Sequence, residues 1–252
     1  VLSIAVGVFA IGVIAGTQHI LDTQFAGAYL ASNPAHATLN TGAFGDDLLA
    51  AAARTEGVEA ASASFGVSVE VQNPASGRWQ DLAVLARPAW YDLPVNSITP
   101  QEGAWPPPLN SIVLERNSLP LLDAQIGDTV QVDLGDGRLR ELVIAGTVHD
   151  INLPPARFVD RLFGYASFET FNRWGYERQF NELMITVAGQ SGDKAHIEAV
   201  AQQVEDKIEK GGGQVFSTSV PDPGQAPVQD ILDALFVILG VLGALSLLLS
   251  GF

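Results

Sequence analysis

The sequence predicts an α+β protein, with an extracytoplasmic module of two subdomains between two transmembrane helices. Three features of the chain support this fold class. An apolar run without charges occupies each end, from Val1 to Leu21 and from Ala234 to Phe252. Two strand–helix–strand patterns lie between these runs, and a stretch rich in strands and turns separates the two patterns. This order favours an α/β layer that carries a β-rich insertion.

The two apolar runs are expected to cross a membrane. Every charged residue of the chain lies between Asp22 and Asp233. A helix of about 20 apolar residues spans the bilayer core, and a lone spanning segment must be helical because lipid offers no hydrogen bonds. We therefore expect residues 22–233 to lie outside the cytoplasm of a plasma-membrane protein. Because both ends are apolar, the chain is expected to be an excerpt of a longer protein.

Each apolar run has an alternative interpretation. The first could be a signal peptide, although it lacks a basic start and a clear cleavage site of small residues. The second could be a buried helix of a soluble protein, although large apolar side chains cover all of its faces. Small residues at Gly12 and Gly16, and at Gly240 and Ala244, would permit close helix contacts. Such spacings are common by chance in apolar helices.

The composition excludes several classes of function. The formal net charge is −15, from 28 acidic and 13 basic residues. An acidic surface repels phosphates, so neither nucleic acid nor anionic lipid head groups are expected partners. The chain has no cysteine, which removes disulfides, thiolate zinc sites and cysteine nucleophiles. About 200 residues between the apolar runs are enough for one large core or two small ones.

The first strand–helix–strand pattern follows a stalk that continues the first apolar helix. Asn33-Pro34 is expected to end that stalk, because a residue before proline avoids helical angles. The transmembrane helix and stalk are therefore residues 1–33, and residues 34–95 form the first part of one subdomain. Its elements are a strand at His36–Thr41, a helix at Phe44–Thr55 closed by Gly57, and a strand at Val58–Gln72.

The second pattern, in residues 181–222, is expected to complete the same subdomain. Apolar residues recur at helical spacing across Asp193–Lys210, where Ser191 can cap the start. The expected strands are Glu182–Ala188 before this helix and Gln214–Val220 after it, with Gly211–Gly213 ending the helix. Two such units form a small α/β subdomain with helices on one face. The strands Val67–Val71 and Leu183–Val187 should then share a sheet.

Residues 96–180 are expected to form the mostly β insertion. Turn residues such as Gly127-Asp128 and Gly135–Gly137 separate its strand-like segments. The expected strands are Ser111–Leu114, Thr129–Leu134 and Leu139–Val148. Residues 223–252 then form a second stalk and transmembrane helix.

No motif predicts catalysis, so we expect no enzyme activity, no cofactor and no metal. His149-Asp150 is the one adjacent histidine–acid pair, and a strand end exposed to water explains it better than a metal or acid–base site. The side chains of Asp46 and Asp47 would point in different directions on a helix, so they are not expected to act as a carboxylate pair. Acids in the first turn of a helix are favoured by its dipole, which explains both residues. The segment Gly189–Lys194 lacks the spacing of a phosphate loop. The tryptophans could line a pocket or, more simply, pack in a core: Trp79, Trp90, Trp105 and Trp174.

The order of these elements resembles a known family. The residues that carry the resemblance are Gly57–Ser62, Ile112–Leu114, Gln125–Val130, Leu142–Val148 and Tyr165–Phe168. Together with the flanking apolar runs, they resemble the periplasmic core domain of MacB/FtsX-like ABC transporter permeases. The resemblance implies a porter-like α/β subdomain with an inserted sabre-like subdomain, in a permease with four membrane helices.

The resemblance also implies partners and an activity. Such permeases lie in the lipid bilayer, dimerise with a second permease subunit, and work with a cytoplasmic ABC ATPase subunit. The phosphate loop of that ATPase is absent from this sequence, so another chain or segment would carry it. The coupled movement can serve export, lipoprotein extraction or regulation of wall hydrolases. The alternative is the ligand-binding sensor domain of a membrane receptor; a tethered hydrolase is disfavoured because no nucleophile–base pair occurs.

Overall fold

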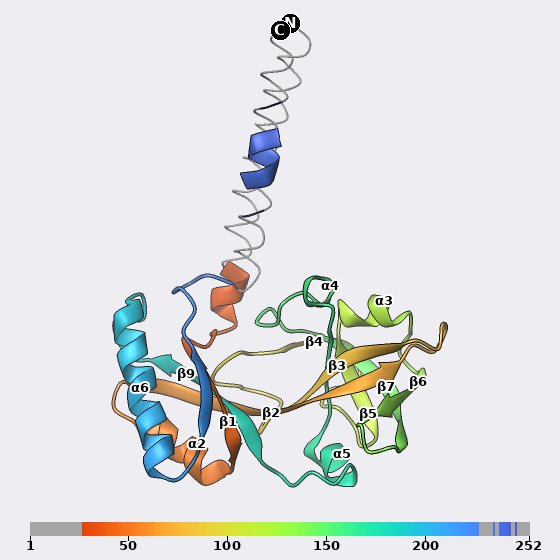
Figure 1. The fold of residues 1–252 in the computed structure, drawn as a ribbon, viewed down its shortest axis with the longest axis horizontal. Coiled ribbons are helices and arrows are strands. Elements are labelled where there is room, and N and C mark those ends of the chain that lie inside the picture. Colours follow the sequence, from red (N-terminus) through yellow and green to blue (C-terminus); the bar gives the residue numbers. More distant parts are fainter. Residues whose placement is uncertain (1–26, 227–233, 235–236, 243–244, 246–252) are drawn as a thin grey trace, which may run out of the picture. The chain divides into compact units, whose positions relative to one another are not determined.

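The protein is described by a computed structural model, which covers residues 27–226, 234, 237–242 and 245 (Figure 1). Its strands are β1 (Ala37–Phe44), β2 (Val58–Gln72), β3 (Trp79–Ala86), β4 (Thr99–Gly103), β5 (Ser111–Glu115), β6 (Thr129–Asp133), β7 (Leu139–His149), β8 (Leu162–Tyr165), β9 (Phe180–Val187) and β10 (Val215–Ser219). Its helices are α2 (Asp46–Ala53), α3 (Ser118–Leu122), α4 (Ala156–Val159), α5 (Phe168–Arg173) and α6 (Lys194–Lys210).

The strands of residues 32–223, which form one compact unit, belong to a single mixed sheet. Their order is β10-β1-β9-β2-β3-β8-β5-β7-β4, and β6 pairs with β2 and β7. The pairs β3–β8 and β5–β7 are parallel, whereas β1, β2 and β9 pair antiparallel with their neighbours. The predicted combination of α-helices and β-strands is therefore confirmed, and the structure adds that one large sheet contains all of these strands.

The long strand β2 changes its main partner along its length. Its first part pairs with β9, from Val58 opposite Val187 to Ser64 opposite Glu182. Its second part pairs with β3, from Phe65 opposite Ala86 to Gln72 opposite Trp79. The predicted strands Val67–Val71 and Leu183–Val187 thus lie in one sheet. The residues of β2 that pair with β9, however, precede Val67.

Among the described residues, the two hydrophobic clusters with the most buried members pack on this sheet. The first, here called the helix-side core, lies between the strands around β9 and the helices α2 and α6, which lie side by side in Figure 1. It contains the predicted apolar face of α6, made of Ile197, Val200, Ala201, Val204 and Ile208. The second, here called the β-side core, contains buried residues of the second part of β2 and of β3, β5, β6, β7 and β8. Because β2 contributes to both, the predicted subdomain boundaries stay predictions.

Most predicted elements are present, but two helix ends differ. Asp193, not Ser191, caps α6, because its side chain accepts a hydrogen bond from the Ala195 amide at 3.0 Å. Helix α2 ends at Ala53 with Arg54 as its cap, so Gly57 is not a helix cap. Gly57 instead lies in the turn into β2 with a φ of 84°, where a Cβ atom would be 2.8 Å from Val200 Cγ2.

The predicted membrane spans fall largely outside the described residues. The run Val1–Leu21 lies outside them entirely, whereas residues 27–31 are helical and end before Asn33-Pro34, as predicted. Within the second run, residues 234, 237–242 and 245 are helical. Over the part of the chain that the structure covers, no helix combines the length and the apolar character needed to cross a membrane.

Candidate functional site

The chain enters the compact unit through a dense set of hydrogen bonds. The amide of Ser97 donates to the carbonyl of Ser32 at 2.8 Å, and the amide of Asn96 donates to the carbonyl of Asn33 at 2.9 Å. The amide of Ala35 donates to Asn96 Oδ1 at 2.7 Å. Asn33 and Asn96 both have positive φ angles, of 49° and 52°, which asparagine tolerates better than most residues.

We call this set of contacts the N-terminal clamp. It comprises Ser32, Asn33 and Ala35 on the entering chain, and Asn96, Ser97 and Asn152 on the segments that bind it. Two buried charged residues, one behind each binding segment, hold the clamp in place.

Arg87 holds the segment that carries Asn96. Its side chain is 4% exposed, and Nη2 donates to the carbonyl of Val95 at 2.9 Å. The same nitrogen lies 3.5 Å from the Asn96 carbonyl and 3.4 Å from Ser62 Oγ on β2. Nη1 lies 3.4 Å from the sulfur of Met184 on β9. One guanidinium therefore connects the clamp to two central strands of the sheet.

Arg87 is unusual because its hydrogen-bond partners among the described residues are all neutral. Among the described residues, no carboxylate forms an ion pair with it, and its buried Nε has no hydrogen-bond partner. Burying a charge without a counter-charge reduces stability, so arginine is rarely buried in this way. In return, its four contacts fix the positions of Val95, Asn96, Ser62 and Met184 relative to one another.

Asp150 holds the second binding segment. Its buried carboxylate accepts hydrogen bonds from the amide of Asn152 at 2.9 Å, from Asn152 Nδ2 at 3.0 Å and from the hydroxyl of Tyr165. Asn152 Oδ1 in turn accepts a bond from Ser32 Oγ at 3.1 Å. Burial, and then the charge of Asp150, raise the pKa of Tyr165 well above its ordinary value, so its hydroxyl stays a donor.

Aromatic side chains enclose this second segment. Trp90 and Trp105 pack edge-on with ring centroids 5.1 Å apart, and both contact the ring of Tyr165 in the same way. Trp105 Nε1 donates to the carbonyl of Trp90 at 3.1 Å. These two tryptophans therefore pack in a core, as does Trp174 against Phe171.

Trp79 differs from the other tryptophans. It is 38% exposed and lines a cavity at the start of β3. One of the four tryptophans thus fits the pocket interpretation.

The other sequence candidates do not converge. His149 Nδ1 lies 3.5 Å from Glu115 Oε1, and its Nε2 lies 3.3 Å from Arg116 Nη2, away from the partners of Asp150. Asp150 itself is buried and bonded, so the expectation of a pair exposed to water is wrong for this residue. The residues that the structure describes include no group of three or more histidines and acids arranged to hold a metal.

The acidic pair and the glycine-containing segment have local roles. Asp46 and Asp47 lie in the first turn of α2, where the helix dipole favours acids. Asp46 also forms an ion pair with Arg178, with 3.5 Å between Oδ1 and Nη2. The segment before α6 ends in the capping residue Asp193. Sequence reasoning missed Arg87 and Asn152, since neither lies in a motif and both act across long sequence separations.

The clamp joins the entering chain to three strands of the sheet. Through Arg87 it reaches β2 and β9, and through Asp150 it reaches Tyr165 on β8. Its contacts are hydrogen bonds between groups that do not react with one another. The clamp therefore fixes the entering chain to the sheet.

The known proteins to which the chain is similar are solved structures. No protein-family model matches the chain, and no curated protein matches it. The chain is similar to the extracellular domain of the noncanonic ABC-type transporter YknZ from Gram-positive bacteria, at 11% identity and a TM-score of 0.47, over 71% of this chain and 100% of that one.

Two further solved structures are of the same kind. The periplasmic region of MacB from Actinobacillus actinomycetemcomitans has 11% identity and a TM-score of 0.44, over 72% of this chain and 87% of that one. A domain of a putative permease protein from Porphyromonas gingivalis has 9% identity and a TM-score of 0.44, over 78% of this chain and 95% of that one.

Proposed function

We propose that this chain is the extracytoplasmic part of an ABC transporter permease, with its flanking apolar runs in the plasma membrane. The observation that carries the proposal is the N-terminal clamp, which links the chain at Ser32 and Asn33 to the strands β2, β8 and β9. A separate cytoplasmic ATPase would drive the membrane helices, and a second permease subunit would complete the dimer. The module moves and performs no bond chemistry. Its movement serves export, lipoprotein extraction or regulation of a hydrolase.

Exposed apolar side chains support a membrane location for the second run. Its described helical residues expose large apolar groups to between 45% and 67%: Val237, Ile238, Leu239, Val241, Leu242 and Leu245. Exposed apolar surface of this kind indicates contact with lipid or with another protein.

The helix that precedes the clamp supports mechanical coupling. Residues 27–31 are helical and lead without a break to Ser32. A helix passes on a displacement that a flexible linker would dissipate. Within the module, we propose that a porter-like subdomain and an inserted sabre-like subdomain are the parts that receive this displacement. The strand β2, which contributes to both cores, is the connection between them.

The coupling is tested in the natural full-length protein with its ATPase. This chain has no cysteine of its own that would take up a label. Nitroxide labels at Ser76→Cys and Gln202→Cys, both at exposed positions, therefore report the distance between these two sites. We expect ATP to change that distance. Inserting Gly-Gly-Ser after Asp22, or replacing Asn96 with alanine, should abolish the change while ATP hydrolysis continues.

Two outcomes would reject this proposal. If the distance responds to ATP equally in both variants, the clamp does not couple the module to the membrane. If no ATPase co-purifies and ATP has no effect, the permease assignment itself fails. A matched control is Asn172→Ala, an exposed asparagine on α5 without a bond to the clamp.

Orientation is tested by labelling. Ser76 lies exposed in the turn between β2 and β3, so Ser76→Cys should react with an impermeant maleimide in intact cells. Protection there, with reaction after lysis, would place the module in the cytoplasm.

A ligand-binding sensor domain is the second candidate function, and the cavity at the start of β3 is the observation that favours it. The sequence that follows Phe252 in the natural protein discriminates between the two. A permease continues with a basic loop and further membrane helices, whereas a receptor continues with a helical signalling segment.

A further inference from the structure

The cavity beside β3 is an open volume of about 550 Å³. It lies between the β2–β3 hairpin and the short helices α3 and α4. Its lining includes three consecutive residues of β3, namely Trp79, Gln80 and Asp81. Leu121 of α3 and Leu162, the first residue of β8, line it as well.

The first three residues of β3 have a strand neighbour on one side only. Trp79, Gln80 and Asp81 pair with β2 through Gln72, Val71 and Glu70. On the other side, β8 pairs with β3 only over Leu82–Leu85. An unpaired strand edge presents backbone N–H and C=O groups that can bind another extended chain.

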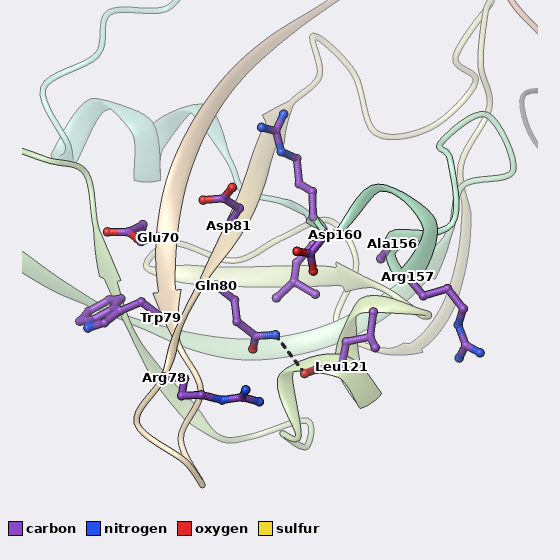
Figure 2. A pocket seen from close by; sticks show the side chains of 11 residues that line it. Glu70, Arg78, Trp79, Gln80, Asp81, Leu121, Ala156, Arg157 and Asp160 are labelled. Carbon is purple, nitrogen blue, oxygen red and sulfur yellow. Dashed lines mark hydrogen bonds between the residues drawn. The ribbon is translucent and has the colours of Figure 1, made fainter.

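Residues from both faces of the strand line the cavity. Successive side chains of a strand point to opposite faces, so Gln80 lies on one face while Trp79 and Asp81 lie on the other. Figure 2 shows Gln80 reaching toward Leu121, with Trp79 pointing away from that contact. The cavity contacts Gln80 on one face of β3 and Trp79 and Asp81 on the other. It therefore opens at the edge of β3 rather than on a face of the sheet.

Gln80 has an unused acceptor inside the cavity lining. Its Nε2 donates to the carbonyl of Leu121 at 3.3 Å, whereas its buried Oε1 has no hydrogen-bond partner. A buried polar atom without a partner costs free energy.

Unpaired arginines also line the cavity. Arg78, Arg157 and Arg161 are three of the chain's 13 basic residues, and no ion pair among the described residues involves them. The planar guanidinium group binds a carboxylate through two parallel hydrogen bonds.

Acids balance these arginines within the same lining. The carboxylates are those of Glu70, Asp81 and Asp160, so the site offers both charges in equal number. This mixture disfavours a polyanion and suits a ligand that carries a carboxylate together with N–H donors, which is the chemistry of a peptide.

We propose that this cavity binds the carboxyl-terminal end of an extended peptide. The peptide backbone pairs with the open edge of β3 at Trp79–Asp81 and continues the line of β8. Its terminal carboxylate binds the arginines of the lining. This site does not depend on the permease assignment.

The test uses the full chain in detergent and a generic probe, because main-chain bonds supply most of the affinity in strand addition. The probe is the peptide Thr-Val-Thr-Val-Ala with a fluorescent label on its amino terminus and a free carboxylate at its other end. Its anisotropy should rise saturably with protein concentration. The same peptide ending in a carboxamide should bind about tenfold more weakly, because it lacks the charge-assisted bond to arginine. A version N-methylated at alternate residues should not bind, because it cannot pair as a strand.

Variants of the protein locate the site. Arg157→Ala and Arg161→Ala should each weaken binding of the carboxylate peptide and leave binding of the carboxamide peptide unchanged. Arg173→Ala is the matched control, since Arg173 is exposed on α5 and lies outside the lining. If the N-methylated peptide binds as tightly as the unmethylated one, the peptide does not pair with the edge of β3 as a strand. The site is overturned if the carboxylate peptide does not bind saturably. It is also overturned if Arg173→Ala loses as much affinity for that peptide as Arg157→Ala and Arg161→Ala do.

Discussion

The side chain of Asn181 makes two hydrogen bonds with the backbone of Gly66. Its Nδ2 donates to the Gly66 carbonyl at 2.8 Å, and its Oδ1 accepts from the Gly66 amide at 2.9 Å. The pairing of β2 with β9 ends just before this point, at Ser64 and Glu182. The carboxamide thus satisfies backbone groups of β2 that have lost their strand neighbour.

Replacing Asn181 with alanine should therefore destabilise the protein. Two backbone groups would lose their partners, at a cost of about 1–3 kcal/mol in the free energy of unfolding. Urea denaturation measures this change. The exposed Asn172→Ala should leave the midpoint within experimental error, and an equal effect of both variants would contradict the role of Asn181.

Arg87 should control how tightly the clamp closes. In Arg87→Met, the carbonyls of Val95 and Asn96 lose their donor, so the segment that binds the entering chain should open more often. We expect amide hydrogen exchange at Asn96 and Ser97 to accelerate about tenfold or more, as opening becomes easier. Exchange at Ala188, whose amide bonds the Gly57 carbonyl elsewhere in the sheet, should stay unchanged. Unaltered exchange at Asn96 would show that Arg87 does not hold the clamp.

Tyr165 should make the protein sensitive to alkali. Its pKa is raised in the folded state, first by burial and then by Asp150. The resulting contribution to stability is fully present below the ordinary tyrosine pKa of about 10, and it is lost as the pH rises through the folded pKa. The free energy of unfolding should thus fall above that pH.

The matching variant separates this effect from general alkaline unfolding. Tyr165→Phe should lower stability near neutral pH by about 1–3 kcal/mol, because Asp150 loses a donor, and it should flatten the alkaline slope. Tyr91→Phe, which changes a tyrosine that is 60% exposed, should keep the slope of the natural protein. Equal slopes in all three proteins would contradict the prediction.

The helix-side core should not tolerate a charge on the buried face of α6. Val204 is fully buried, and Val204→Asp would place a carboxylate without a partner in that core. We expect unfolding of the module, since such a change costs several kcal/mol. Gln203→Asp adds the same charge at the neighbouring exposed position and should fold normally, as circular dichroism would show. A folded Val204→Asp variant would mean that the core admits water.

The spacing of apolar residues was sufficient to predict a helix or strand where the segment is long and has one buried face. The spacing from Ile197 to Ile208 predicted α6, and alternation over Val58–Gln72 predicted β2 with its observed bounds. Shorter or more polar strands escaped this reasoning. All residues of β4 are exposed, β8 has only 4 residues, and β3 begins with Trp79-Gln80-Asp81, which shows no apolar alternation.

The clamp could not be predicted in the same way, because its contacts connect residues far apart in the chain. Ser32 and Asn152 are 120 positions apart, and no local pattern marks either residue. A lone arginine such as Arg87 is normally exposed, so its burial depends on tertiary packing. The fold class of the unit therefore followed from local signals, whereas the clamp required the structure.

The shared strand β2 limits how this protein can be divided. A cut near Ser64 would leave β1 and the first part of β2 in one fragment and β9, the strand that pairs with both, in the other. Each fragment would expose a long unpaired edge, which promotes aggregation. Neither fragment should therefore fold independently. The regions on either side of Ser64 must instead fold and unfold together as a single cooperative unit.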